Sequence, residues 1–229
     1  MKRGTLIVID GTDGVGKATQ TALLIKRLKK ESKKVATLDF PQYEQNLFGA
    51  LVGECLAGEH GDFLKFSPHV ASVLYAADRF ESKKKIEKWL SEGRVVILDR
   101  YVSANQLHQG GKIRDLKKRK EFLAWLDRME YGVFGLPRPD AIIYLSLPVK
   151  ISLKLLTQKR AQDKKKYLKG KKDAHEGNVK HLLDAQKSAL AIIRSKGKWH
   201  KIECADKKGI LPRETIAEEV YATVKQVLK

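Results

Sequence analysis

The most constraining feature of the chain is a glycine-rich segment near its start. Residues 11–19 follow the apolar run Leu6–Ile9 directly and precede a stretch with helical spacing. In such a strand–loop–helix context, glycines let backbone N–H groups point inward, the helix N-terminus adds positive potential, and a lysine reaches the outer phosphates. The sequence therefore predicts a phosphate-binding loop for a nucleoside triphosphate. Its expected residues are Gly11, Thr12, Asp13, Gly14, Val15, Gly16, Lys17, Ala18 and Thr19.

One position of this loop departs from the usual motif. Ala18 stands where a Ser or Thr normally ligates Mg²⁺, and Thr19 is turned away by about a third of a helical turn. We therefore expect other groups to hold most of the metal. A purely structural tight turn is the alternative, but the two glycines at fixed spacing, together with Lys17, favour phosphate binding.

Short apolar runs alternate with longer segments of helical spacing along the whole chain. Strands buried on both faces read as continuous Val, Ile and Leu, and helical crossovers connect parallel strands. The rhythm predicts one domain over residues 1–229, an α/β protein with the three-layer α/β/α P-loop NTPase fold and a five-stranded parallel sheet. We expect strands at 6–9, 35–38, 95–98, 141–147 and 199–203, and helices at 17–32, 45–58, 67–92, 118–131, 149–163, 176–196 and 213–228.

The composition is that of a globular protein, with 42% hydrophobic and 32% charged residues. No apolar run approaches the roughly 20 residues that a membrane span requires, and the short N-terminal apolar stretch belongs to the first strand. We therefore expect a cytoplasmic protein without a signal peptide. Cys55 and Cys204 lie far apart without metal-ligand spacing, which predicts reduced, packed thiols.

The formal net charge of +19 raises the alternative of nucleic-acid binding. The densest basic segment, Lys159–Lys172, has eight Lys or Arg and one Asp, whereas other basic residues form short runs on helices. No aromatic stacking platform accompanies them. We interpret the charge as a solvated surface that contains one functional basic loop, a mobile lid at about 159–175.

Polar residues follow the expected third strand. In a doubly wound sheet, ligands bind at the carboxyl ends of the strands. There Asp99 can hold Mg²⁺ directly or through water, and the planar guanidinium of Arg100 can clamp an acceptor phosphate and offset charge during transfer. A strand cap and a structural ion pair are the alternatives for these two residues.

Four segments resemble thymidylate kinases in order along nearly the whole chain: the phosphate loop, Phe40-Pro41-x-Tyr43, Ala77-Asp78-Arg79, and Asp99-Arg100-Tyr101 through Gln109-Gly110. These P-loop kinases transfer the γ-phosphoryl group of ATP to dTMP with Mg²⁺, and most are homodimers. The resemblance implies the same substrates, ATP and dTMP, with Mg²⁺ as cofactor and a second copy as partner, and no nucleic acid or membrane.

The resemblance also assigns roles to individual residues. Arg79 reads the thymine edge, Asn105 completes base recognition, and Tyr75 or Phe40 contacts the ring, although core packing is the alternative for these two aromatic residues. Asp13 lies near the sugar hydroxyl, Tyr43 near the acceptor phosphate, and Gln109 in a substrate-side loop. The expected dTMP site comprises Asp13, Phe40, Tyr43, Tyr75, Arg79, Arg100, Tyr101, Asn105, His108 and Gln109.

Two departures from the family pattern affect these assignments. Gly14 stands where some members carry Arg, so the resemblance moves that cation to the lid, with Arg160 as the best candidate. His108 replaces the Tyr or Phe that crowds the ribose 2′ position, so discrimination against ribonucleotides is either weaker or supplied by Tyr101. In the lid, Lys164, Lys165 or Lys166 could assist Arg160, and Glu176, just after the lid, could order its closed form or bridge to substrate groups.

The expected catalytic set is thus Lys17, Asp99, Arg100 and Arg160, with Asp99 as the metal ligand. Another pyrimidine nucleotide kinase on the same scaffold is the nearest alternative. A nucleic-acid-binding ATPase is a more distant one, and it predicts hydrolysis stimulated by DNA or RNA. Ala18 alone suggests a member that binds nucleotides without turnover.

Overall fold

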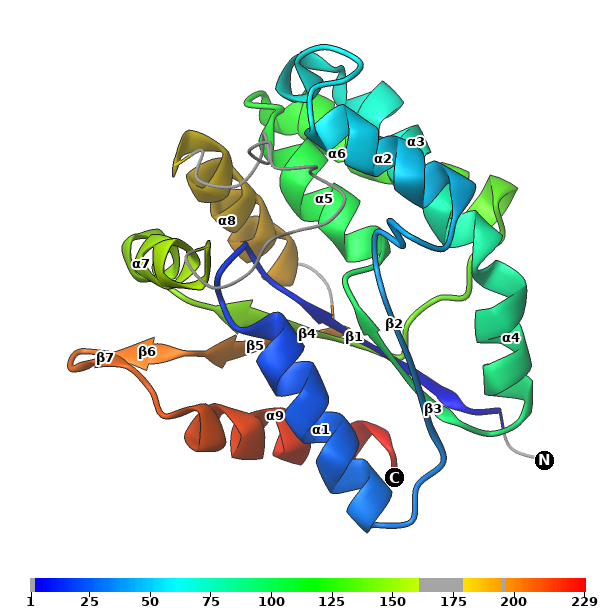
Figure 1. The fold of residues 1–229 in the computed structure, drawn as a ribbon, viewed down its shortest axis with the longest axis vertical. Coiled ribbons are helices and arrows are strands. Elements are labelled where there is room, and N and C mark those ends of the chain that lie inside the picture. Colours follow the sequence, from blue (N-terminus) through cyan, green and yellow to red (C-terminus); the bar gives the residue numbers. More distant parts are fainter. Residues whose placement is uncertain (1–2, 161–178, 195–196) are drawn as a thin grey trace.

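The fold is built on a parallel sheet that matches the predicted one. The computed structural model describes residues 3–160, 179–194 and 197–229. Its five-stranded sheet has the order β2-β3-β1-β4-β5, and every neighbouring pair is parallel (Figure 1). Each observed strand agrees with the predicted range to within one residue at either end. The strands are β1 Thr5–Asp10, β2 Val35–Asp39, β3 Val95–Asp99, β4 Ala141–Ser146 and β5 Trp199–Glu203.

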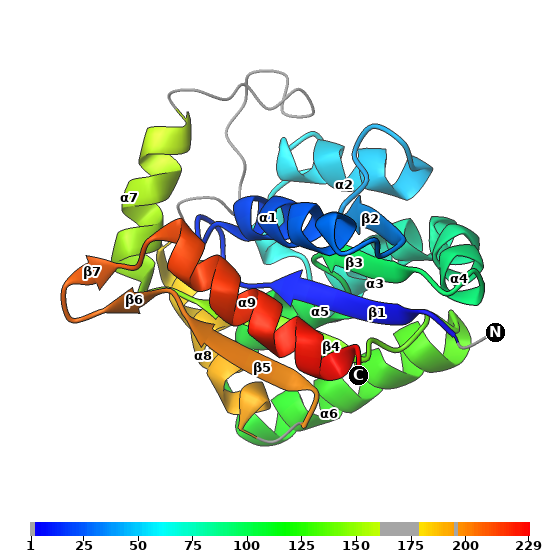
Figure 2. The same cartoon turned by 90° about the horizontal axis from the view of Figure 1, so that it is seen from below.

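Helices cover both faces of this sheet. Side chains alternate along β1, so Leu6 and Val8 pack in a core with α4, α5 and α8, whereas Ile7 and Ile9 pack in another with α1 and α9. Helices α1 and α9 lie side by side in both ribbon views (Figures 1 and 2). The predicted three-layer architecture is therefore confirmed. These helices are α1 Lys17–Lys30, α4 Lys83–Ser91, α5 Val102–Gly111, α8 Val179–Ile193 and α9 Arg213–Val227.

The remaining elements lie at the ends of these layers. Helices α2 Leu47–Leu56 and α3 Pro68–Glu81 pack on each other around a small separate core that includes Phe63 of the 3-10 turn η1 Phe63–Lys65. Helix α6 Leu116–Asp127 continues into one π-helical turn, η2 Arg128–Val133. Strands β6 Ala205–Asp206 and β7 Gly209–Ile210 form an antiparallel hairpin, and α7 Val149–Arg160 follows β4.

Two helix predictions were wrong. The single helix expected at 67–92 is broken at Ser82, which ends α3 and begins α4 with φ −87° and ψ −5°. The segment 102–111 was expected to be non-helical and forms α5. Nearly every residue of α5 is buried, so its sequence lacks the polar face that marks a surface helix, and Asn105 with two terminal glycines lowers helix propensity.

Several expectations concern residues near the end of α7. The helix ends at Arg160, whose side chain lies outside the described part of the chain, as do the predicted lid residues Lys164, Lys165 and Lys166 and the predicted Glu176 after the lid. Across the described residues, the helices are too short or too polar to cross a membrane. Cys55 and Cys204 are buried and free, as predicted.

Candidate active site

The loop between β1 and α1 closes around the amine of Lys17. Asp10 ends β1, and its carboxylate accepts hydrogen bonds from the Gly11 amide at 2.8 Å and from the Ser103 hydroxyl of α5. Lys17 is buried at the first position of α1, and its Nζ donates to the carbonyls of Gly11 at 3.1 Å and Thr12 at 3.0 Å. The lysine is thus folded over the loop, at the helix N-terminus, where phosphates bind.

The charge of this amine is held by nearby carboxylates. Burial lowers the pKa of Lys17, and the neighbouring Arg100 lowers it further. Asp13, Asp99 and Asp10 act in the opposite direction, because their negative charges favour the ammonium form. The group is therefore a concentrated arrangement of opposite charges from which water is largely excluded.

Gly14 and Gly16 permit the backbone path of the loop. Both have positive φ, 80° and 89°, where side chains are strained. At Gly14 a Cβ would also lie 2.5 Å from the carbonyl oxygen of Ser152 in α7, whereas at Gly16 no atom lies within 4 Å of the added carbon. The close approach of α7 therefore leaves no room in this chain for the arginine that some relatives carry at the position of Gly14.

Asp99 and Arg100 lie at the carboxyl end of β3, next to the loop. The Arg100 amide donates to the Ile9 carbonyl of β1 at 3.0 Å, and its φ of 67° turns the chain away from the sheet. The Arg100 guanidinium pairs with Asp13 through Nη2 and lies 2.9 Å from His108 Nε2 through Nη1. The structure therefore brings together the predicted Asp13, Arg100 and His108 from three segments of the chain.

Burial and charge shift the pKa values of both residues at the end of β3. Burial raises the pKa of Asp99, against the opposing effects of Lys17 and Arg100. Burial lowers the pKa of Arg100, but the carboxylates of Asp13, Asp10 and Asp99 outweigh this effect and raise it overall. The guanidinium is thus a permanent cation in a confined polar site.

A second polar group lies between α3, α5 and η2. Arg79 donates to both carboxylate oxygens of Glu130, from Nε and Nη2, each at 2.8 Å, and both side chains are almost fully buried. The Asn105 amide nitrogen donates to Glu130 at 2.8 Å and to the Ser72 carbonyl at 3.1 Å. The predicted base-reading residues Arg79 and Asn105 therefore converge on one carboxylate. The sequence analysis missed Glu130, because it lies in a segment that was expected to be the end of an ordinary helix.

The other predicted dTMP residues have more varied surroundings. Phe40 and Tyr101 lie in the core, with ring centroids 6.1 Å apart, and the Tyr101 hydroxyl donates to the Pro137 carbonyl at 3.2 Å. The Phe40 amide donates to the Asp99 carbonyl at 3.0 Å, which joins this segment to the end of β3. Tyr75 is half-buried against Phe63, and Tyr43 lies at the edge of the same cluster.

Gln109 and Asp78 illustrate two kinds of buried polar side chain. Gln109 lies on α5 and not in the loop expected for it; it is fully buried, and neither of its amide atoms has a hydrogen-bond partner among the described residues. Asp78 instead accepts from the Gln42 amide at 3.2 Å and from Asn46 at 2.9 Å, which ties the 40–43 segment to α3. Burial raises the pKa of Asp78. Within Ala77-Asp78-Arg79, Asp78 therefore has a structural role. Buried polar groups are normally hydrogen-bonded, so the Gln109 amide is a candidate to bind a ligand.

Comparison with known proteins decides the family. A model of thymidylate kinases matches residues 9–210 of the chain. The chain belongs to the thymidylate kinase family. A thymidylate kinase of Mycobacterium tuberculosis is 35% identical over 147 residues, 64% of this chain and 68% of the relative. A probable thymidylate kinase of Pyrococcus horikoshii is 38% identical over 154 residues, 66% and 69% of the two chains. A thymidylate kinase of Plasmodium falciparum is 30% identical over 147 residues, 64% and 63% of the two chains.

Thymidylate kinases use ATP, and the residues of this chain also fit Mg²⁺. In the described residues, the Asp99 carboxylate makes no hydrogen bond or ion pair, while that of Asp10 is engaged by Gly11 and Ser103. Thr19 is exposed, as its position on the helix predicted. No group of three or more metal-binding side chains is found within the same residues. The Asp99 carboxylate suits Mg²⁺, which is usually held by one or two carboxylates together with substrate phosphates and water.

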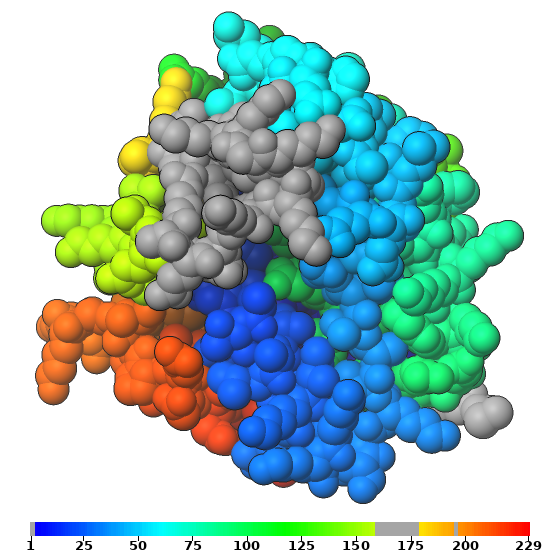
Figure 3. All heavy atoms as spheres, viewed as in Figure 1, coloured from blue at the N-terminus to red at the C-terminus, as the bar shows by residue number. Residues whose placement is uncertain are grey.

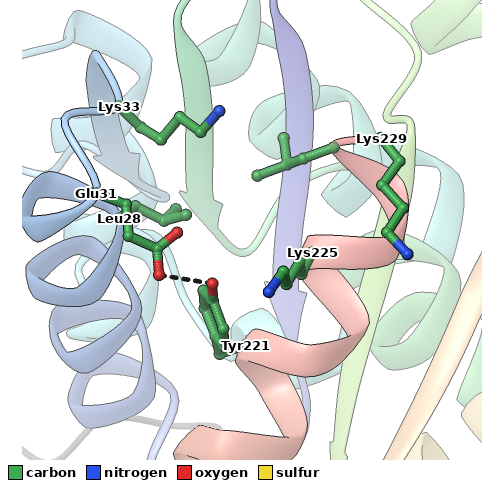
Figure 4. Close-up of a pocket in the computed structure, with 7 residues that line it drawn as sticks. Leu28, Glu31, Lys33, Tyr221, Lys225 and Lys229 are labelled. Atoms are coloured by element: carbon green, nitrogen blue, oxygen red, sulfur yellow. Dashed lines mark hydrogen bonds between the residues drawn. The ribbon is translucent and has the colours of Figure 1, made fainter.

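The thymidylate kinase fold also has a surface pocket away from this site. It is lined by the C-terminal ends of α1 and α9 and has a volume of about 220 Å³ (Figure 4). On its rim the Tyr221 hydroxyl donates to Glu31 at 2.6 Å. Because α1 begins at the phosphate loop and rises about 1.5 Å per residue, its far end lies about 20 Å from Lys17. The pocket is therefore separate from the site formed by the phosphate loop, Asp99 and Arg100.

Proposed function

We propose that this protein transfers the γ-phosphoryl group of ATP to dTMP, with Mg²⁺, and so forms dTDP and ADP. The observation that carries the proposal is the convergence of Lys17 and Arg100 beside Asp99 at the carboxyl edge of the sheet. Phosphoryl transfer depends on positioned cations that meet the charge spread over the equatorial oxygens. One buried cation, Lys17, one partly buried cation, Arg100, and a carboxylate suited to hold the metal supply that arrangement.

Each of these residues has a distinct task in the proposed reaction. Lys17 binds the outer phosphates of ATP as they displace its contacts with the loop carbonyls. Arg100 clamps the phosphate of dTMP, and Asp13 holds the guanidinium before substrate arrives. Asp99 holds Mg²⁺, which neutralises phosphate charge when bound. No general base is required, because a phosphate acceptor is already ionised near neutral pH. Arg160 and the segment 159–175 supply the further cation proposed for the lid.

The donors around Glu130 support thymine as the base. Both hydrogens of the Asn105 amide are engaged by Glu130 and Ser72, so its carbonyl oxygen is the atom left to accept from a ligand. Glu130 accepts from Nε and from one N–H of Nη2 in Arg79, so among the described residues the Nη1 side of the guanidinium is left to donate to a ligand. One acceptor beside one donor matches the imide N–H and carbonyl of thymine, whereas cytosine presents the opposite pattern at these positions.

A second copy of the chain is the proposed partner, and the cytoplasm is the proposed location. Val70, Val73 and Phe80 on α3 are exposed, and their spacing puts them on one helix face. Leu47 and Phe48 extend this apolar surface onto α2, whose light-blue segment lies on the outside of the molecule in Figure 3. An exposed patch of this kind is typical of an interface. ATP as co-substrate and two free buried thiols support a reducing, cytoplasmic setting.

A coupled ADP-release assay tests the activity. The protein, ATP and Mg²⁺ are combined with dTMP, dUMP, UMP, CMP, AMP or GMP, with and without single-stranded DNA. We expect ADP release that requires dTMP and does not respond to DNA. Release with CMP but not dTMP would contradict the base pocket. Release that ignores every monophosphate but rises with DNA would contradict the kinase assignment and support the nucleic-acid-binding ATPase instead.

A further inference from the structure

A line of hydrogen bonds leads from Arg100 to a residue of α8 that has no part in the proposed reaction. Arg100 Nη1 lies 2.9 Å from His108 Nε2, and His108 Nδ1 lies 3.2 Å from His181 Nε2. The two imidazole rings are stacked, with centroids 5.2 Å apart and planes inclined by 22°. Both histidines are less than a tenth exposed. The geometry therefore connects β3, α5 and α8 through side chains alone.

The chemistry of arginine fixes the protons along this line. A guanidinium can only donate, so His108 Nε2 must accept, and His108 must be neutral with its proton on Nδ1. That proton points at His181 Nε2, which must therefore accept as well. His181 is then also neutral and protonated on Nδ1. Only this assignment of protons makes both contacts hydrogen bonds.

The surroundings of His181 favour its neutral form. Burial, with smaller contributions from Lys112 and Arg100, lowers the pKa of His181 to about 4 against the opposite effects of Asp13 and Asp184. Lys112, at the end of α5, has a buried Nζ without a hydrogen-bond partner among the described residues, and burial lowers its pKa to about 8. The groups that face His181 thus come from the loop, from the end of β3, from α5 and from α8 itself.

We propose that His181 is a positioning residue for phosphoryl transfer: by accepting from His108 it holds His108 in the tautomer that aims Arg100 at the acceptor phosphate. This rests on the role of Arg100 in the proposed function. Without an acceptor at His181, His108 can carry its proton on Nε2, where it faces the Arg100 N–H donor to donor. The guanidinium then turns away from His108 and its alignment with the phosphate is lost.

Two substitutions separate this role from simple packing. His181→Phe keeps an aromatic ring that can stack but removes the acceptor, whereas His181→Gln places an amide oxygen close to where Nε2 lies. We expect His181→Phe to lower kcat/KM for dTMP about tenfold, the effect of a lost positioning hydrogen bond. The KM for ATP stays unchanged in both variants, and His181→Gln restores most of kcat/KM. His200→Gln on β5 is the control for removing a histidine elsewhere.

A measurement that does not depend on activity tests the tautomers. In the wild-type protein, ¹⁵N NMR of the imidazole nitrogens is expected to find both His108 and His181 protonated on Nδ1. His108 protonated on Nε2 would overturn the proposal, as would equal losses of kcat/KM in the two variants accompanied by a raised KM for ATP. A wild-type protein that has the expected tautomers but no dTMP-dependent ADP release overturns the proposed function and leaves the hydrogen-bond line supported.

Discussion

Two arginine–carboxylate pairs in this chain share a bidentate geometry but differ in environment. Arg79 and Glu130 are buried, whereas the side chains of Arg138 and Asp127 are 57% and 36% exposed. Removing one partner of a buried pair leaves an uncompensated charge, so Glu130→Gln is expected to lower the free energy of unfolding by about 3 kcal/mol. Asp127→Asn, the matched exposed change, is expected to cost under about 1 kcal/mol. Urea unfolding measures both, and equal losses would contradict the burial argument.

Arg100 provides the residue-scale test of the transfer chemistry. Replacing a preorganised cation that meets transition-state charge typically costs on the order of 10² in rate or more, so Arg100→Ala is expected to lower kcat/KM for dTMP by at least about that factor. ATP binding, measured by calorimetry, is expected to survive because Lys17 and the loop remain. Arg94→Ala, which removes a surface pair with Glu92, is the control. Loss of ATP binding with intact dTMP binding would contradict the role of Arg100.

His181 also links stability to pH. Burial lowers its pKa from an ordinary 6.5 to about 4, so between these values the unfolded chain binds a proton that the folded chain excludes. Stability is therefore complete above pH 6.5 and is lost as the pH falls to 4, by roughly 3 kcal/mol. The stability advantage of wild type over His181→Gln is expected to shrink by that amount between pH 7 and pH 4. If urea unfolding gives the same difference in stability between the two proteins at pH 7 and at pH 4, His181 does not titrate in this way.

At the scale of elements, the contact between α7 and the phosphate loop distinguishes two glycines. Gly14→Ala and Gly16→Ala both place a side chain at positive φ, which costs about 1–2 kcal/mol. Only at Gly14 does the new carbon meet the Ser152 carbonyl, so Gly14→Ala must also displace α7. We expect the larger loss of stability and of ATP affinity for Gly14→Ala, measured by thermal unfolding and calorimetry. Equal losses of stability and ATP affinity in the two variants would mean that α7 can move away from the loop at little cost in free energy.

The elements differ in how far the sequence alone predicts them. Strands β1, β3 and β4 are apolar runs buried along nearly their whole length, which makes them the strongest strand signals, whereas the edge strands β2 and β5 alternate between buried and exposed residues. Helix α5 was missed because burial on all sides removes the amphipathic period on which prediction depends. The break at Ser82 is marked by neither Gly nor Pro, so no local helix breaker predicts it.

The residues of the candidate active site also differ in how far the sequence predicts them. The phosphate loop and the Asp99-Arg100 pair were predictable, because strand ends and glycine-rich loops are local features of the sequence. Glu130 was not, because it reaches Arg79 and Asn105 only through a π-helical turn and the packing of three helices. His181 lies 73 residues from His108, and only the fold places the two rings together. Long-range polar contacts of this kind have no spacing from which to predict them.

At the scale of the whole molecule, the exposed apolar face of α3 predicts the assembly. We expect light scattering to give twice the 25.9 kDa of one chain, because a stable interface needs about 1,200–2,000 Å² and α2 with α3 offers an apolar centre for it. Val73→Glu puts a charge in that centre and is expected to give a monomer. Ile210→Glu is the matched control, because Ile210 is also exposed but lies on β7, away from α2 and α3. A monomeric wild-type protein would contradict the proposed dimer. Equal dissociation by both variants would mean that the interface lies elsewhere on the surface.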